Sequence, residues 1–465
     1  MFFKSFFDEN LAQMSYMVGC QKTGEALVID PARDITPYLE TSRKEGFDIT
    51  SISETHIHAD FLSGARELAH QTGAKLYLSD EGEDDWKYAF AEEYSHQWLK
   101  GGDQFYVGNV RLDVLHTPGH TPESLSFLLT DEGGGSEVPM GIFTGDFVFV
   151  GDIGRPDLLE KAAGAAGTAD QGARQMYKSI QAFKELPDYV QLWPGHGAGS
   201  ACGKSLGAVP TSTVGYEKIN NWALTTENEH QFSDELLEGQ PEPPTYFGMM
   251  KKLNKEGPAL LSVDQSIDQL TAEDVEQLTA KGTAVIDTRS KETFAEGHLK
   301  GTLNIPFNKG FANWAGWLIN YDQDIVIISD EEQVRDIQKA LQSIGLDRLV
   351  GYVLSEEVNH QENLETYTSI TAEELEKKFK NEDDYIIVDV RNQSEWDEEH
   401  MEEAIHVMLG TLPDRLNEIP DNKTPIVHCQ SGVRSAIATS VLQANGFKDT
   451  LNLKGGFGAW KDYSQ

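Results

Sequence analysis

The stretch THIHADF (residues 55–61) decides how the first part of this 465-residue chain folds, and it overlaps the end of the strand-like run ITSISET (residues 49–55). It places His56, His58 and Asp60 just beyond a predicted strand end. Residues that alternate within a strand share one face, whereas a loop at the strand end can direct several imidazoles to one point. The stretch therefore predicts a site built where a buried strand gives way to a loop.

Three further candidate ligands occupy similar positions along the chain: His120 in TPGHTP, Asp146 in FTGDF and His196 in WPGHG. Each follows a run of strand-forming residues and lies in a loop rich in Gly or Pro. A lone histidine in such a loop is usually an ordinary hydrogen-bonded residue. Four histidines and two aspartates at predicted strand ends instead indicate a metal site.

The order of these motifs resembles the metallo-β-lactamase superfamily, in which HxHxDH is followed by a single His, Asp and His. The resemblance implies an αββα sandwich for residues 1–237. One position departs, because Phe61 stands where the family has the last His of HxHxDH. In dinuclear hydrolases that His binds the second zinc, which a phenyl ring cannot do. A second ion would be left with a weak set, Asp60, His196 and a shared Asp146, so we expect a mononuclear site.

The residues by themselves are compatible with two metals. Two imidazoles and a carboxylate on one face suit non-haem Fe(II), whereas a zinc hydrolase would use its metal to lower the pKa of bound water. More narrowly, the domain resembles the persulfide dioxygenase branch of the superfamily. That resemblance implies one Fe(II) per chain, with the ligands His56, His120 and Asp146. It leaves His58, Asp60 and His196 to orient these ligands.

Three other residues of this region need an interpretation. On the same resemblance, Arg155 in GDIGRPDLL lies near the thiol substrate, where paired hydrogen bonds would hold an anionic tail. Cys202 follows His196 in GHGAGSACGKS, so we expect it beside the metal and active in handling persulfide sulfur. A structural arginine and an unreactive buried thiol are the alternatives. Cys20, in the apolar run SYMVGC, is expected to be buried and inert.

Beyond residue 237 the chain contains a Pro-rich stretch and then an internal repeat. Residues 238–261 include EGQPEPP, which is typical of a linker. The runs AVIDTR and IIVDVR each end a predicted buried strand on Asp-x-Arg, and alternating strands and helices follow both. This alternation predicts α/β modules with parallel sheets at residues 262–355 and 366–465.

The last module places Cys429 in the loop CQSGVR (residues 429–434), between the strand TPIVH and a predicted helix. Backbone N–H groups and the helix dipole at such a junction favour a thiolate and any anion bound to it. The motifs VDVR, HCQSGVRS and GGFGAW resemble the rhodanese family. The resemblance implies that Cys429 carries a persulfide. It also implies that the rest of the loop binds the substrate: Gln430, Ser431, Gly432, Val433 and Arg434.

The middle module resembles the same family, but Ser329 and Asp330 stand where the reactive cysteine belongs. A serine hydroxyl cannot carry a sulfane sulfur, and an aspartate repels anionic substrates. We expect this copy to be an inactive module with a structural or docking role.

Composition narrows the class of protein further. A hydrophobic fraction of 39% is typical of a globular protein, and three widely spaced cysteines argue against a disulfide framework. A net charge of −38 disfavours nucleic-acid binding. Because the sequence shows neither a secretory signal nor a run of about 20 apolar residues, we expect a cytoplasmic protein with no membrane partner. The superfamily resemblance implies a homo-oligomer.

The resemblance to persulfide dioxygenases and rhodaneses implies that small thiol persulfides are oxidised by O₂ to sulfite, and that Cys429 combines sulfite with sulfane sulfur to give thiosulfate. The first alternative is a thioester hydrolase of the glyoxalase II type with appended sulfurtransferase domains, which Phe61 disfavours. The second alternative is a sulfur carrier or sensor, in which Cys429 relays persulfide to a partner.

Overall fold

The computed structural model describes residues 1–465 except 164–166, 199, 201, 205, 262–266, 380–383 and 465. The chain forms two compact units, Met1–Val263 with Gln342–Gly345, and Asp264–Leu341 with Leu346–Gln465. Within the described residues, no helix combines the length and the apolar composition needed to cross a membrane.

The first unit contains two sheets that face each other. The first sheet follows chain order through β1 (Phe2–Asp8), β2 (Gln13–Gly19), β3 (Glu25–Ile29), β4 (Asp48–Ser53), β5 (Lys75–Ser79) and β6 (His96–Leu99). The second sheet has the order β12 (Ser212–Thr213), β11 (Gln191–Pro194), β10 (Gly141–Gly145), β9 (Leu125–Asp131), β8 (Val110–His116) and β7 (Gln104–Val107). Strands β3 to β6 are parallel, and so are β10 and β11.

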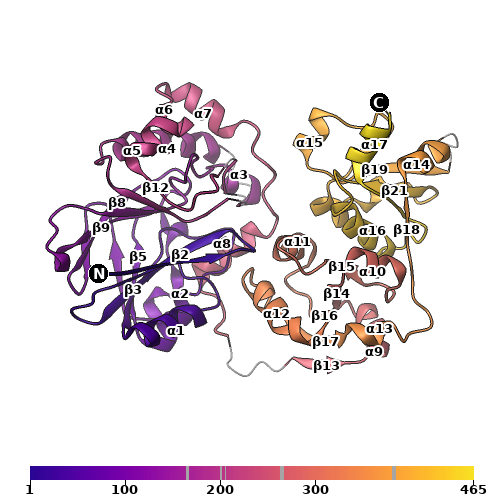
Figure 1. The fold of residues 1–465 in the computed structure, drawn as a ribbon, viewed down its shortest axis with the longest axis horizontal. Helices are drawn as coiled ribbons and strands as arrows, with labels where there is room; N and C mark the ends of the chain where they lie inside the picture. The colour runs from indigo at the N-terminus through magenta and orange to yellow at the C-terminus, as the bar shows by residue number, and fades with distance from the viewer. Residues whose placement is uncertain are drawn as a thin grey trace. The chain divides into compact units, whose positions relative to one another are not determined.

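Apolar side chains from both sheets fill the layer between them, and helices cover the outer faces. The inner layer includes Tyr16, Leu27, Leu112 and Phe127, all fully or almost fully buried. Helices α1 (Thr36–Glu45) and α2 (Ala65–Thr72) pack on the first sheet. The second sheet is covered by α4 (Thr168–Lys184), α5 (Val214–Asn220), α6 (Trp222–Thr225) and α7 (Glu229–Leu237), as Figure 1 shows. This arrangement confirms the predicted αββα sandwich.

Residues 238–261, which the sequence suggests as a linker, contain a helix in the structure. Helix α8 (Phe247–Glu256) begins after the prolines and buries Phe247, Met250 and Asn254. A shorter helix, α3 (Leu158–Ala163), precedes α4. The sequence did not indicate α8, because the neighbouring prolines obscure its short apolar pattern.

The second unit contains two modules, each built on a parallel sheet as predicted. The first has the strand order β13 (Asp268–Leu270), β17 (Leu349–Leu354), β16 (Ile325–Ser329), β14 (Ala284–Asp287) and β15 (Leu303–Asn304). Its helices are α9 (Ala272–Ala280), α10 (Lys291–Glu296), α11 (Phe311–Leu318), α12 (Val334–Gln342) and α13 (Ser355–Val358).

The second module repeats this order with β18 (Thr368–Ile370), β22 (Leu451–Leu453), β21 (Thr424–His428), β19 (Tyr385–Asp389) and β20 (Ala404–His406). Its helices are α14 (Ala372–Phe379), α15 (Gln393–Glu398), α16 (Arg434–Ala444) and α17 (Gly456–Ser464). The two modules pack on each other within this unit. The backbone N–H of Asn304 donates to the Ser440 hydroxyl at 2.9 Å, and Phe294, Tyr367 and Ala436 share a small apolar cluster.

The repeated Asp-x-Arg motif forms a buried ion pair at the ends of β14 and β19, the strands next to the edge strands β15 and β20. Asp389 accepts hydrogen bonds from Nε and Nη2 of Arg391, and Nη2 also donates to the Glu399 carbonyl at 2.7 Å. Arg289 and Asp287 make the same arrangement in the first module. The arginine thereby ties the strand end to the loop that follows it.

Removing one partner of this pair should strongly destabilise the last module. We expect Asp389→Ala to lower its free energy of unfolding by about 3–5 kcal/mol, because the Arg391 charge stays buried without a partner. Urea denaturation of the full chain measures this. The control is Glu373→Ala, which breaks an exposed pair with Lys377 and should change stability by at most about 0.5 kcal/mol. Equal effects of the two substitutions would contradict the structural role of the motif.

Candidate metal centre and sulfur-transfer loop

The residues predicted to bind or orient the metal all lie just beyond the ends of strands in the first unit. His56, His58 and Asp60 follow β4, and His120 follows β8. Asp146 follows β10, and His196 follows β11. Strand β9 is antiparallel to both β8 and β10, and β10 is parallel to β11. Strands β8, β10 and β11 therefore run in the same direction and end at the same edge of the second sheet.

Two imidazoles and one carboxylate converge in what we call the first metal group, His56, His120 and Asp146. The Nε2 atoms of His56 and His120 lie 3.9 and 3.6 Å from the same oxygen, Asp146 Oδ2. One potential ligand atom from each residue lies within 4.8 Å of the other two. All three side chains are buried. The structure thus brings together the three residues predicted as metal ligands.

The hydrogen bonding of this group fits a bound cation. His56 Nε2 and both carboxylate oxygens of Asp146 are buried without a hydrogen-bond partner among the described residues. A buried polar atom without a partner costs about 1–3 kcal/mol, and more when it is charged. A metal ion placed among these atoms would satisfy them together.

The opposite ring nitrogen of each histidine is anchored to an oxygen. His56 Nδ1 lies 3.0 Å from the Thr55 hydroxyl, His120 Nδ1 lies 2.9 Å from the carbonyl of Arg155, and His196 Nδ1 lies 3.2 Å from the carbonyl of Ala12. A carbonyl can only accept, so Nδ1 of His120 and His196 carries the proton. Their Nε2 lone pairs therefore point to the centre of the site, as metal ligation requires.

The second metal group comprises Asp60, His196, Cys202 and Asp146, the last shared with the first group. His196 Nε2 lies 3.0 Å from Asp60 Oδ2 and 3.4 Å from Asp146 Oδ1. The sequence predicted only a weak ligand set for a second ion. The structure corrects this prediction, because the chain folds Cys202 into the set. A thiolate, an imidazole and two carboxylates are ligands that zinc accepts.

The thiol of Cys202 is fully buried beside these acidic residues. Burial raises its pKa, and the carboxylates of Asp60 and Asp146 raise it further. The thiol is therefore protonated and a poor nucleophile unless a nearby cation stabilises the thiolate. The structure places Cys202 next to the predicted metal ligands, and its role in sulfur transfer stays a prediction.

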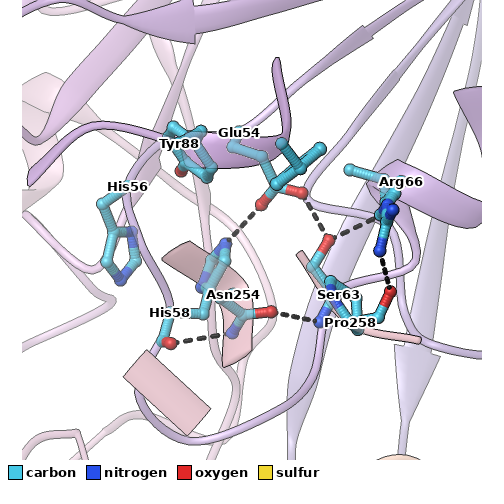
Figure 2. Close-up of a pocket in the computed structure, with 10 residues that line it drawn as sticks. Glu54, His56, His58, Ser63, Arg66, Tyr88, Asn254 and Pro258 are labelled. Carbon is cyan, nitrogen blue, oxygen red and sulfur yellow. Dashed lines mark hydrogen bonds and ion pairs between the residues drawn. The ribbon is translucent and has the colours of Figure 1, made fainter. Parts of the chain in front are cut away.

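His58 points away from the first metal group and into a pair of carboxylates. Its Nε2 lies 3.1 Å from Glu54 Oε2 (Figure 2) and 3.2 Å from Asp30 Oδ1. Burial by itself lowers the pKa of His58, but the two carboxylates outweigh it and raise the pKa well above its ordinary value. Asp30 also accepts hydrogen bonds from the backbone N–H and hydroxyl of Thr55, at 2.7 and 2.9 Å. Because Thr55 in turn contacts His56, these contacts link His58 to a predicted metal ligand.

Phe61 fills the position of the missing histidine with an apolar ring. It is 1% exposed, and its ring centroid lies 4.3 Å from that of His58. The phenyl ring therefore covers the imidazole and leaves no nitrogen there for a second ion.

The sequence analysis missed four supporting residues: Asp30, Glu54, Glu123 and Asn254. A signal for Asp30 was available, since it directly follows β3, which is parallel to β4 and ends at the same edge of the first sheet. Glu123 accepts from the backbone N–H of Ile57 at 2.8 Å, between the first two histidines of the motif. Neither Glu123 nor Asn254 belongs to a local pattern, so only the fold reveals their contacts.

The Arg155 side chain makes contacts other than the paired hydrogen bonds to a substrate that the sequence suggested. Its side chain is fully buried, and Nε and Nη2 each donate to Asp157 at 2.7 Å. Nη2 also donates to the carbonyl of Pro241 at 2.7 Å. Among the described residues, Nη1 alone of the three nitrogens has no partner. A substrate could receive paired hydrogen bonds only after the bonds to Asp157 break, and the role of Arg155 in substrate binding stays a prediction.

In the last module, Cys429 lies between β21 and α16, as the sequence indicated. The thiol is 1% exposed, and the backbone N–H of Gly432 donates to its sulfur at 3.1 Å. Gly432 adopts a φ of 89°, which favours glycine. A Cβ at Gly456 would lie 2.2 Å from the Cys429 carbonyl, which explains the second glycine of GGFGAW.

The polar side chains of the loop are held by neighbours. Arg434 donates to both oxygens of Glu395, at 2.6 and 2.7 Å, so an anionic substrate would share this guanidinium with a carboxylate. Gln430 accepts from Arg391 at 3.3 Å. Lys291, from the middle module, donates to the Gly432 carbonyl at 3.3 Å. The middle module thus contacts the loop that holds Cys429.

Two other predicted substrate-binding residues, Ser431 and Val433, lie in the same loop between Cys429 and α16.

In the middle module, the position that corresponds to Cys429 holds a buried serine. Ser329 ends β16, is buried, and donates to the carbonyl of Asp330 at 3.2 Å. A buried hydroxyl that faces its own backbone supports the prediction of an inactive copy.

Comparison with known proteins identifies the class to which this chain belongs. Residues 9–196 match the metallo-beta-lactamase superfamily, and residues 271–354 and 371–463 each match the rhodanese-like domain. The crystal structure of a metallo-beta-lactamase from Staphylococcus aureus subsp. aureus COL is 50% identical, with a TM-score of 0.69. The match covers 76% of this chain and 99% of that chain. The protein therefore belongs to the metallo-beta-lactamase superfamily and carries two rhodanese-like domains.

More distant relatives match parts of the chain. The hydroxyacylglutathione hydrolase of Nitrosococcus oceani is 33% identical over 185 residues, which cover 39% of this chain and 61% of that protein. The crystal structure of ETHE1 from Myxococcus xanthus is 24% identical and covers 55% of this chain and 98% of that chain, with a TM-score of 0.45. The chain spans between 53% and 61% of the length of the first four curated relatives. The combination of domains indicates an enzyme, either a hydrolase or an enzyme of sulfur metabolism.

Removing a ligand of the first metal group should release the metal. We expect His120→Ala to weaken metal binding by more than about 100-fold, since even residues behind the ligands contribute about 10–100-fold. Metal content per chain after dialysis, measured by mass spectrometry, tests this. His70→Ala, at an exposed histidine of α2, is the control and should retain the metal of the unmodified protein. An unchanged metal content in His120→Ala would exclude the site.

Acid should destabilise the last module through His428, which precedes the reactive cysteine. Burial lowers its pKa to about 4. Because the pKa of His428 is lower in the folded protein than in the unfolded chain, its neutral ring makes a contribution to stability. This contribution is fully present above the ordinary pKa near 6.5 and is lost as the pH falls towards 4. The shift corresponds to about 3 kcal/mol. We expect urea midpoints measured across this window to fall less steeply in His428→Gln than in the unmodified protein. Identical pH profiles would contradict the assignment.

Proposed function

We propose that this protein oxidises small thiol persulfides with O₂ to sulfite at a single Fe(II), and that its rhodanese cysteine converts sulfite to thiosulfate. The observation that carries the proposal is the composition of the first metal group. His56, His120 and Asp146 supply two imidazoles and one carboxylate, while His58 is withdrawn into ion pairs with carboxylates. A dinuclear hydrolase would use His58 as a ligand and a further histidine at position 61.

The donor set supports iron in place of zinc. When bound to two imidazoles and one carboxylate, Fe(II) keeps open positions at which O₂ and a substrate sulfur can react. The chain contributes the rest of the environment. The anchored Nδ1 atoms hold the ligand rings in place, and the burial of all three ligands excludes bulk water from the site.

The overall oxidation balances without a further reductant. A persulfide reacts as RSSH + O₂ + H₂O → RSH + SO₃²⁻ + 2H⁺. Four electrons pass from the outer sulfur to O₂, and the S–S bond breaks to release the thiol. Water supplies the third oxygen of sulfite.

The second step takes place at Cys429 and involves no net oxidation. The step is Cys–S–SH + SO₃²⁻ → Cys–SH + S₂O₃²⁻, in which the outer sulfur leaves cysteine for sulfite. The Gly432 N–H that donates to the sulfur would stabilise the departing thiolate. The sulfur on Cys429 would come from a second persulfide molecule, RSSH + Cys–SH → RSH + Cys–S–SH, and the presence of both kinds of domain in one chain supports this pairing of reactions.

A thioester hydrolase remains the second candidate, and one observation favours it. The second metal group includes Cys202, so a second ion would have more ligands than the sequence suggested. The similarity to a hydroxyacylglutathione hydrolase points the same way. Phe61 weighs against this candidate, because it removes the histidine that would complete the second site.

Oxygen uptake by the iron-loaded protein tests the proposal. We expect O₂ consumption with glutathione persulfide, coenzyme A persulfide or another small thiol persulfide. In Cys429→Ser, O₂ consumption should persist while thiosulfate production falls by more than about 1000-fold, as expected when a nucleophile is removed. Sulfite should then accumulate.

Cys20→Ser is the matched control, since Cys20 is a buried thiol of the first unit outside both metal groups. It should leave O₂ uptake and thiosulfate yield unchanged. Two zinc ions per chain with thioester hydrolysis and no persulfide-dependent O₂ uptake would establish the hydrolase instead. A complete loss of O₂ uptake in Cys429→Ser would refute the separation of the two steps.

A further inference from the structure

We propose that Asn254, on α8, is a positioning residue of the metal centre that holds residues 58–63, here called the metal loop, in the shape needed for ligation. The residue lies well beyond residues 9–196, which match the superfamily. It belongs to a segment whose sequence resembles a linker. The proposal requires a bound metal but does not depend on which reaction the metal supports.

The Asn254 side chain uses its whole amide on the metal loop. Its Nδ2 donates to the carbonyls of His58 and Phe61, both at 2.8 Å, and its Oδ1 accepts from the backbone N–H of Ser63 at 2.9 Å. Figure 2 shows the bonds to His58 and Ser63. Asn254 is 3% exposed, so water cannot readily replace these bonds. One side chain thus ties both ends of the loop together.

The bonded positions enclose the functional residues of the loop. Asp60 lies between the carbonyls of His58 and Phe61, and its carboxylate meets His196 in the second metal group. At the other end, Ser63 also donates its hydroxyl to Glu54, which pairs with the ring of His58. The Asn254 amide therefore fixes the backbone on both sides of Asp60. It also fixes the backbone of His58, whose imidazolium lies behind His56.

Helix α8 is itself packed firmly against the rest of the first unit. Phe247 and Met250 are buried, and the Lys251 ammonium lies 3.7 Å from the ring centroid of Trp86. Beyond the helix, Arg66 donates to the carbonyl of Pro258 at 2.8 Å, and the N–H of Leu261 donates to Glu67 at 2.8 Å. Contacts on both sides of Asn254 thus prevent its side chain from withdrawing.

The space around this contact is small. The cavity lined by Glu54, His58, Tyr88 and Asn254, among others, has a volume of about 10 Å³, close to that of one water probe. Loss of the amide would leave two carbonyls and one N–H of the loop without partners in a place with little room for solvent. The loop would then relax, and residues behind metal ligands typically contribute about 10–100-fold to affinity.

Variants of the full-length protein loaded with Co(II) test the proposal. Asn254→Ala removes all three bonds, and Asn254→Asp keeps the size and the acceptor but replaces both donors with a second acceptor. We expect both variants to release Co(II) to a chelator about 10–100-fold faster, with an altered visible absorption spectrum. Lys255→Ala is the control on the same helix, because it breaks only an exposed ion pair with Asp85. Folded Asn254 variants with the release rate and spectrum of Lys255→Ala would overturn the proposal.

Amide hydrogen exchange of the unmodified protein tests the role of Asn254 even if the variants fail to fold. If Asn254 couples α8 to the metal loop, Co(II) must slow amide hydrogen exchange in both residues 58–63 and residues 247–256. Protection confined to residues 58–63 would overturn the proposal. Since Co(II) binding is the readout, failure of the proposed oxidation of persulfides would leave this result unaffected.

Discussion

The first unit depends on one electrostatic constraint: buried ligand atoms that need a cation meet at the edge of its sheets. The lone pair of His56 Nε2 and the carboxylate of Asp146 have no hydrogen-bond partner among the described residues. Local backbone strain accompanies this arrangement. Ala12 and Asp30 are the described non-glycine residues with positive φ, at 52° and 50°. Ala12 anchors His196 and Asp30 anchors Thr55, so both strained residues support the ligand geometry.

Support for the metal site comes from layers that are far apart in the sequence. The ends of β3 and β4 supply the residues around His56, the second sheet supplies His120 and Asp146, and α8 holds the loop between them. A centre assembled in this way depends on packing between the two sheets. Asn254, in the segment after the superfamily match, is one of the distant residues that contact this site.

In the second unit, the question is how charged groups are arranged around Cys429. The chain has a net charge of −38, which repels anions, so binding of an anion beside Cys429 would require hydrogen-bond donors there. Arg391 and Arg434 are committed to Asp389 and Glu395. The backbone N–H of Gly432 donates to the Cys429 sulfur, and Lys291 from the middle module donates to the Gly432 carbonyl. The middle module thereby contacts the loop that holds Cys429.

Local sequence patterns determined the αββα sandwich, the two parallel-sheet modules, the residues that converge on the metal and the cysteine loop. They could do so because each depends on strand-ending motifs that alternate regularly with turns and helices. The tertiary structure decided the rest. It turned His58 towards Asp30 and Glu54, folded Cys202 against Asp60, occupied Arg155 with Asp157, and placed Asn254 on the metal loop. These contacts join residues that share no periodic pattern, so only the three-dimensional fold brings each buried polar group to its partner.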